Sequence, residues 1–324
     1  MKTATLSLAV LALLVAPASS LWAGDSDAEA KAWLSRMIQS AGRLNYEGVF
    51  VYVQGQHVES MRILQNAASG RQRMIALNGM PREVVVASSG VVCLLPNQRL
   101  AMGGAGYRRA PFPPTLPEEL DQLEGSYDFK LLGEDRVAGY KVKIVDIRPR
   151  DQMRYGYRLW LEDDSAMVLR SALLDERQRI LEQIMFTTLR LDTAVDESQL
   201  DAAAAPDRPT TEPAPEAVSR SDWVIAELPP GFREVMHTRY RRMGSKAPTE
   251  HIVLSDGLAT ISVFLERLAE GDKPVLEGAS PIGAMNAYGR VVAGHQALVV
   301  GEAPVATVER IATALSRREG AAPP

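Results

Sequence analysis

Cysteine and histidine are scarce in this chain. Its 324 residues include one cysteine, Cys93, so a disulfide within the chain is impossible. The four histidines are His57, His237, His251 and His295, and no two of them lie two or four residues apart. Such spacing would let one strand or one helix present two imidazoles to the same metal ion. We interpret each histidine as a solvated or hydrogen-bonded side chain and expect neither a metal site nor a cofactor.

Motifs that organise catalysis are also missing. The chain contains no G-x-S-x-G, no G-x-x-x-x-G-K-[ST], no H-E-x-x-H and no C-x-x-C. The acidic run 162–164 falls at an expected hairpin turn, where such residues are ordinary. The glycine-rich run 103–106 is not followed by the helix that a phosphate cradle requires. We therefore predict a binding protein without catalytic residues, not an enzyme.

Long apolar runs are absent after the N-terminus. Leu6–Ala16 is mostly apolar over about eleven residues, too short for the roughly 20 that a membrane-spanning helix needs, and Lys2 precedes it. This is the pattern of a signal peptide, with cleavage expected after Ala23 or, alternatively, after Ala18. Losing residues 1–23 removes Lys2 and no acidic residue, so the formal net charge changes from −4 to −5. We expect a soluble periplasmic protein, and its location and charge argue against nucleic acid as a partner.

A proline- and alanine-rich stretch divides the mature chain. Residues 200–219 contain four prolines, and such a composition favours an extended segment that cannot bury enough apolar area to fold. We predict a linker at 198–220 between an N-terminal domain at 28–197 and a C-terminal domain at 221–318.

The N-terminal part predicts one helix and a large antiparallel sheet. Between residues 28 and 41, apolar side chains recur every three or four residues, at Trp33, Leu34, Met37, Ile38 and Ala41. Strand-like runs follow at 46–53, 57–64, 71–77, 83–87, 90–95, 99–102, 127–132 and 139–147, and three more fill 148–189. An open sheet of about eleven strands must curl or split. We predict a mainly β, α+β fold in which an unclosed β-barrel wraps around the helix.

The C-terminal part predicts a smaller unit of the same class. Strand patterns occur at 232–241, 251–254, 258–265, 284–292 and 297–300. Pro304 then starts a helix expected to run to about Arg317, because Val308, Ile311 and Leu315 share one face. The predicted result is a small antiparallel sheet backed by one helix.

Two regions are candidates for ligand binding. A half-barrel that one helix does not fill would leave a concave apolar face suited to an acyl chain or an apolar peptide. Its candidate residues are Phe50, Tyr52, Tyr155, Tyr157, Trp160, Leu161 and Phe186, with ordinary core packing as the alternative. The irregular segment 103–122 is either a plain surface loop or a flap whose Tyr107, Phe112 and Leu116 contact the ligand.

A basic run offers a candidate surface for a protein partner. Arg239 and Arg241 follow Phe232 in the expected strand 232–241, and Arg242 comes directly after it, in an otherwise acidic chain. Three arginines together suit an anionic partner, whereas a solvated strand end is the alternative interpretation.

Several motifs resemble one known family. They are P-R-D-x-x-R-Y-G-Y-x-L-W-L from Pro149, L-R-S-x-L-L-D from Leu169, I-L-E-Q-x-x-F-T-x-L from Ile180, and L-P-P-G-F from Leu228. A further match covers 255–265. In this order they resemble the RseB/MucB family, periplasmic negative regulators of the envelope-stress sigma factor sigma-E. The resemblance also implies an N-terminal barrel similar to that of LolA-type lipoprotein carriers.

The resemblance implies a regulatory binding function. Such a protein would bind the periplasmic region of a membrane-spanning anti-sigma factor, protect it from regulated proteolysis and release it on lipidic stress signals. An acyl chain, lipopolysaccharide, a mislocalised lipoprotein and a second copy of the chain are further candidate partners. A lipoprotein or lipid carrier, or a chaperone, is the alternative function. The predicted linker is richer in proline and alanine than the family pattern, so the family's interdomain geometry is not carried over.

Overall fold

The computed structural model describes residues 23–87, 90–96, 98–102, 116–201, 216–218, 221–241, 247–269 and 271–318. The expected signal peptide lies outside these residues apart from Ala23, and so does the predicted linker between 202 and 215. Within the described ranges, no helix is both long and apolar enough to cross a membrane.

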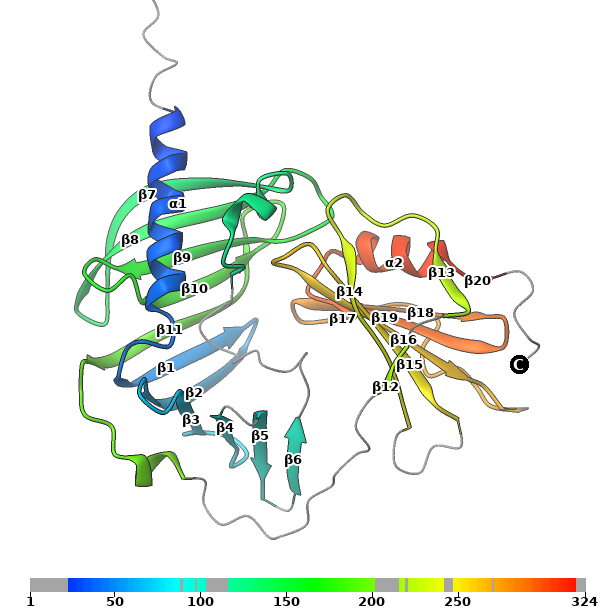
Figure 1. Cartoon of the computed structure of the whole chain (residues 1–324), viewed down its shortest axis with the longest axis horizontal. Helices are drawn as coiled ribbons and strands as arrows, with labels where there is room; N and C mark the ends of the chain where they lie inside the picture. Colours follow the sequence, from blue (N-terminus) through cyan, green and yellow to red (C-terminus); the bar gives the residue numbers. More distant parts are fainter. Residues whose placement is uncertain are drawn as a thin grey trace, which may run out of the picture.

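Eleven antiparallel strands form the N-terminal sheet, and they curl around helix α1 (Ala23–Ser40) (Figure 1). The strands are β1 (Tyr46–Gln54), β2 (His57–Asn66), β3 (Arg71–Ala76), β4 (Glu83–Ala87), β5 (Gly90–Leu95), β6 (Gln98–Met102), β7 (Tyr127–Val137), β8 (Tyr140–Pro149), β9 (Gly156–Glu162), β10 (Val168–Leu174) and β11 (Ile180–Leu191). Their order is β6-β5-β4-β3-β2-β1-β11-β10-β9-β8-β7, so β6 and β7 are the two edges. The predicted unclosed barrel around a helix is confirmed.

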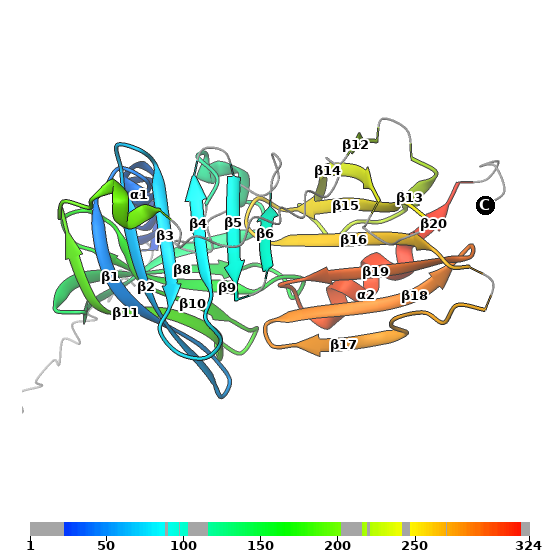
Figure 2. The same cartoon turned by 90° about the horizontal axis from the view of Figure 1, so that it is seen from below.

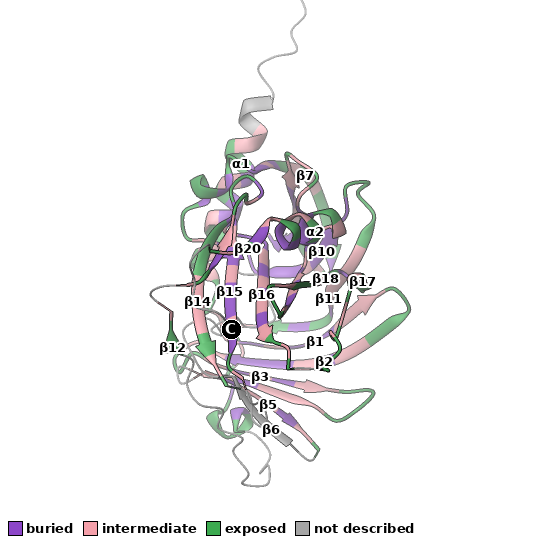
Figure 3. Cartoon of the chain, turned by 90° about the vertical axis from the view of Figure 1, so that its right-hand side faces the viewer, coloured by how far each residue is buried: buried purple, intermediate pink, exposed green. Residues whose placement is uncertain are grey.

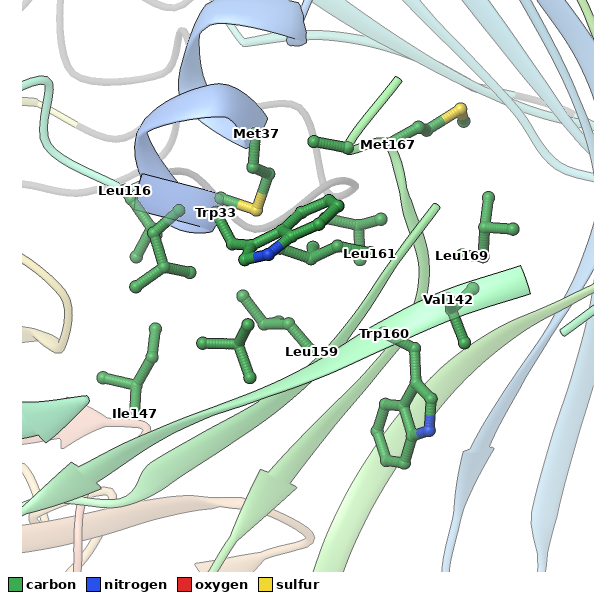
Figure 4. Packing of buried hydrophobic residues seen from close by; sticks show 14 of the residues in the cluster. Trp33, Met37, Leu116, Val142, Ile147, Leu159, Trp160, Leu161, Met167 and Leu169 are labelled. Atoms are coloured by element: carbon green, nitrogen blue, oxygen red, sulfur yellow. The ribbon is translucent and has the colours of Figure 1, made fainter. Parts of the chain in front are cut away.

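Helix α1 is held on the concave face by the apolar stripe seen in the sequence. Trp33, Leu34 and Met37 are buried in one core cluster with residues from most of the strands. Figure 4 shows Trp33 and Met37 pointing from the helix toward Leu159 and Leu161 of β9. The helix begins at Ala23 rather than at the expected residue 28. Asp27 in this added turn accepts the Phe129 N–H at 3.3 Å, which ties it to β7.

The C-terminal sheet has seven strands backed by helix α2 (Val305–Ala314). Its order is β12 (Glu216–Ala217), β14 (Arg233–Tyr240), β15 (Thr249–Ser255), β16 (Thr260–Arg267), β19 (His295–Gly301), β18 (Met285–Val292) and β17 (Gly278–Ile282). Buried positions run along β15 and β16 and over α2 (Figure 3). They form a second core that is separate from the one under α1. The predicted small sheet with one helix is confirmed.

Some predicted boundaries were wrong, each for a local reason. Strand β7 continues to Val137 because a bulge between Leu131 and Gly133 lets the pairing resume. The last helix ends at Ala314, because Leu315 is extended and β20 (Leu315–Arg317) pairs with β13 (Trp223–Ile225). Strands as short as β12, β13 and β20 carry too few residues for a period-2 pattern.

The first residues of the predicted linker lie against the N-terminal sheet. A short 3-10 helix, η2 (Glu197–Leu200), follows β11, and Leu200 is buried with Val195 and Leu64. Arg71 donates to the Leu200 carbonyl at 3.0 Å. The packed segment therefore includes Leu200, and the linker remains a prediction for the residues that lie outside the described ranges.

Candidate functional site at the junction of the two sheets

The candidate cavity residues do not form one surface. Phe50, Leu161 and Phe186 are buried in the core under α1, and the Phe50 and Phe186 ring centroids are 5.9 Å apart. Trp160 points away from Leu159 and Leu161 (Figure 4). Its indole N–H donates to Asp135 at 3.2 Å, and the Arg170 guanidinium lies 4.1 Å from its ring. Trp160 is thus buried in the same core cluster, but its side chain leaves β9 on the face opposite to Leu159 and Leu161.

The three candidate tyrosines lie toward the second sheet. Tyr155 is buried in a cluster with Leu173 and Ala284, and half-buried Tyr157 packs against it. The Tyr52 hydroxyl donates to Glu182 at 2.8 Å. Burial, together with this carboxylate, raises the pKa of Tyr52, so the hydroxyl keeps its proton. Tyr155 and Tyr157 thus belong to a contact between the two sheets.

A small cavity lies under the C-terminal end of α1. Its volume is about 20 Å³, and its lining includes Met37, Leu44, Tyr46, Gln65 and Met167. A space of this size holds about one water molecule. This cavity as it stands is therefore too small for an acyl chain.

The described residues among the flap and arginine candidates do not lie together in one site either. Tyr107, Phe112 and Arg242 lie outside the described residues, and Leu116 is buried in the core under α1. Arg241 is exposed.

Arg239 and Phe232 lie in different surroundings. Arg239 pairs with Glu250, whose other oxygen lies 3.2 Å from His237 Nε2, so a local carboxylate already offsets the Arg239 charge. Phe232 is buried where the two sheets meet, with its ring 5.1 Å from the Arg154 guanidinium.

Arg154 occupies the centre of this junction. Figure 2 shows the two sheets side by side along the long axis of the molecule. The Arg154 side chain, fully excluded from solvent, donates to both carboxylate oxygens of Asp151 at 3.0 Å. It also pairs with Asp256 and donates to the Pro230 carbonyl, both from the C-terminal part. One guanidinium therefore joins an acid from each part of the chain.

Asp256 is saturated with donors. One carboxylate oxygen accepts the N–H groups of Leu258 and Ala259 at 2.9 and 2.7 Å. The other accepts from Arg154 and from the Tyr127 hydroxyl, the latter at 2.9 Å. Burial and the neighbouring carboxylate raise the pKa of Tyr127 well above its usual value, so this hydroxyl remains a donor. All four interactions require acceptor oxygens on Asp256.

Two turns of the C-terminal part fit closely against the N-terminal part. Gly231 has a φ of +79°, and a Cβ there would lie 2.5 Å from Ser126 Oγ. Gly257 has a φ of +103°, and its Cβ would lie 3.0 Å from Leu123 Cδ2. Glycine is therefore required at Gly231 both for its backbone conformation and for the contact.

A second set of contacts extends the junction. Asn286 donates to the Tyr155 hydroxyl at 3.0 Å and to the Ala303 carbonyl at 2.8 Å. Buried Thr307, at the start of α2, donates to the Met153 carbonyl at 2.9 Å. The loop between β8 and β9 thus supplies Met153, Arg154 and Tyr155 in succession.

Three family-like motifs meet at this one place. Asp151 and Arg154 come from P-R-D-x-x-R, Pro230 to Phe232 come from L-P-P-G-F, and Asp256 begins the D-G-L of 255–265. The motifs are recognisable in the sequence, but nothing local in them assigns Arg154 or Asp256 to a site. The available signal was that arginine and aspartate stood within distinctive segments on either side of the predicted linker.

The described residues contain no group of three or more histidine, cysteine or acidic side chains able to hold a metal ion. The described part of the chain thus combines a curled eleven-stranded sheet around a helix with a seven-stranded sheet, joined through a buried junction.

The chain belongs to the MucB/RseB family. The family model of the MucB/RseB N-terminal domain matches residues 29–204, and that of the C-terminal domain matches residues 217–316. The chain is 32% identical to the sigma factor AlgU regulatory protein MucB of Pseudomonas aeruginosa, with 99% of each chain covered. It is 28% identical to the sigma-E factor regulatory protein RseB of Haemophilus influenzae, with 96% of each covered.

Solved structures of MucB also resemble this chain. The crystal structure of MucB in complex with MucA(peri) has a TM-score of 0.70 and 29% identity, covering 90% of this chain and all of that one. The Pseudomonas aeruginosa MucA/MucB complex has a TM-score of 0.71 and 28% identity, with the same coverage. The predicted family is thereby confirmed.

Proposed function

We propose that this protein is a periplasmic regulator that binds the periplasmic region of a membrane-spanning anti-sigma factor. The observation that carries the proposal is the similarity to MucB structures solved with MucA, which extends over both sheets and 90% of the chain. The names of the relatives describe regulatory proteins, which supports a binding function rather than catalysis.

Binding would protect the partner from regulated proteolysis. A protease requires an extended, accessible stretch of backbone, and a bound segment is withdrawn from it. The signal-peptide pattern at Leu6–Ala16 supports export to the compartment in which such a segment would lie.

Lipidic stress signals would act through the apolar interior of the first sheet. The core under α1 is lined by large apolar residues, but its cavity of about 20 Å³ is too small for an acyl chain. Lipid binding in this interior would therefore need α1 or the adjoining loops to move, because Trp33 and Met37 of α1 occupy the space over β9 (Figure 4).

A protease-protection assay tests this function. The periplasmic segment of the anti-sigma factor is incubated with the site-specific envelope protease, with and without the mature chain. We expect the chain to slow cleavage and an acylated ligand to restore it. Equal cleavage rates with and without the folded chain would contradict the proposal. Co-purification of acyl lipid without any protein partner would favour the carrier function instead.

A further inference from the structure

The chemistry of the Arg154 junction allows two arrangements of the sheets and disfavours those between them. The guanidinium and the Asp256 carboxylate are both fully buried and paired. Fully separated sheets would let water solvate both groups. A slight rotation would instead leave them dry and without correct partners, and breaking a buried pair in that way is strongly destabilising. Such a junction behaves as a lock with a closed and an open state rather than as a flexible contact.

The close fit of two turns, at Gly231 and Gly257, also favours a single closed arrangement of the two sheets. The turn before Phe232 approaches Ser126 so closely that a single added carbon at Gly231 would overlap it. The turn at Gly257 approaches Leu123 in the same manner. Because closely packed surfaces resist sliding, these contacts favour one angle between the two sheets.

The lock is connected directly to the core under α1. Met153, Arg154 and Tyr155 all contact the C-terminal part, and β9 begins at the next residue. Leu159 and Leu161 of β9 belong to the same buried cluster as Trp33 of α1. A movement of α1 that shifts β9 would therefore also shift the loop that holds the lock.

We propose that the network of Arg154, Asp151, Asp256 and Tyr127 is a conformational lock that fixes the angle between the two sheets, and that its opening lowers affinity for the anti-sigma segment. The second half rests on the proposed function, whereas the first does not. In the closed state the two sheets present one continuous binding surface. In the open state each sheet presents only its own part of that surface.

The distance between two spin labels, one on each sheet, tests the lock without any partner. Labels are attached at Lys130→Cys and Glu277→Cys, both exposed positions, in a full-length mature chain carrying Cys93→Ser. The otherwise unaltered protein should give one narrow distance distribution. Asp256→Asn should broaden it, because an amide places a donor group against existing donors whichever way it is oriented.

Glycine variants supply a matched pair. Gly231→Ala should broaden the distribution because its Cβ meets Ser126. Gly294→Ala imposes the same kind of backbone strain, with φ at +73°, but meets nothing within 4 Å, so its distribution should stay narrow. Thr307→Val removes the hydrogen bond from Thr307 to the Met153 carbonyl, at the edge of the junction. This variant replaces Asp256→Asn in the test if Asp256→Asn does not fold.

Affinity for the purified periplasmic segment of the anti-sigma factor is then measured with the same variants. We expect Gly231→Ala and Asp256→Asn to weaken binding at least about tenfold, or ~1.4 kcal/mol, and Gly294→Ala to leave it unchanged. Narrow distributions in both junction variants would overturn the lock. Broad distributions with unchanged affinity would overturn its role in binding. If the unaltered chain does not bind the segment, the proposed function fails while the distances still decide the lock.

Discussion

Removing the Arg154 charge should destabilise the protein far more than removing a comparable exposed arginine. Arg154→Met keeps much of the side-chain volume but leaves the Asp256 carboxylate buried without its cation. Breaking a buried ion pair in this way costs about 3–5 kcal/mol. The loss should appear in urea denaturation followed by tryptophan fluorescence, because Trp33 and Trp223 report on the two cores.

Arg148→Met is the matched control. Arg148 also pairs with a buried aspartate, Asp146, but its own side chain is 36% exposed, and Arg158 pairs with the same carboxylate. Its removal should therefore cost less than about 1 kcal/mol. Equal losses for the two variants would refute the inference that Arg154 holds a dry junction.

A double-mutant cycle sharpens the test. Asp256→Asn alone should also be strongly destabilising, since all of its interactions require acceptor oxygens. Combining it with Arg154→Met removes both charges at once, so the double variant should lose less than the sum of the single losses by about 1–3 kcal/mol. Additive losses would show that the two residues act independently and that the contact carries no coupling.

Three further outcomes are expected. Trp33→Ala should lower stability by about 3–5 kcal/mol in thermal denaturation, whereas Glu29→Ala on the exposed side of α1 should change it by less than about 0.5 kcal/mol. Replacing Arg239 and Arg241 together by glutamate should weaken binding of the anti-sigma segment at low salt, with a loss that shrinks at high salt; a loss independent of salt would contradict a charge-driven surface. Burial, with nearby His237, lowers the pKa of His251 below 6.5. The unfolded chain therefore binds this proton more readily, so stability should fall as pH drops below about 6.5, and His251→Gln should reduce that slope in urea titrations.

Local patterns in the sequence predicted most of the fold. Period-2 alternation located the long strands, and the stripe of Trp33, Leu34 and Met37 located α1, because both patterns reflect burial of one face. Short edge strands such as β13 and β20 escaped notice because their pairing depends on a distant partner.

The junction could not be predicted from local patterns for a similar reason. Arg154 and Asp256 meet across 102 positions of sequence, and nothing in either segment states that their side chains converge. Phe232 was expected to contact a partner, but the turn at Gly231 directs it into the junction beside Arg154. The motifs identified the distinctive segments of the sequence. The three-dimensional arrangement shows that these segments meet at one buried junction.

Calorimetric titration of the mature chain with the purified periplasmic segment of the anti-sigma factor is the decisive test of the proposed function. We expect saturable binding, together with weaker binding of an acylated ligand once the segment is bound, because coupling between two sites is reciprocal. Absence of saturable binding by a chain whose circular dichroism shows it to be folded would contradict the proposed binding function.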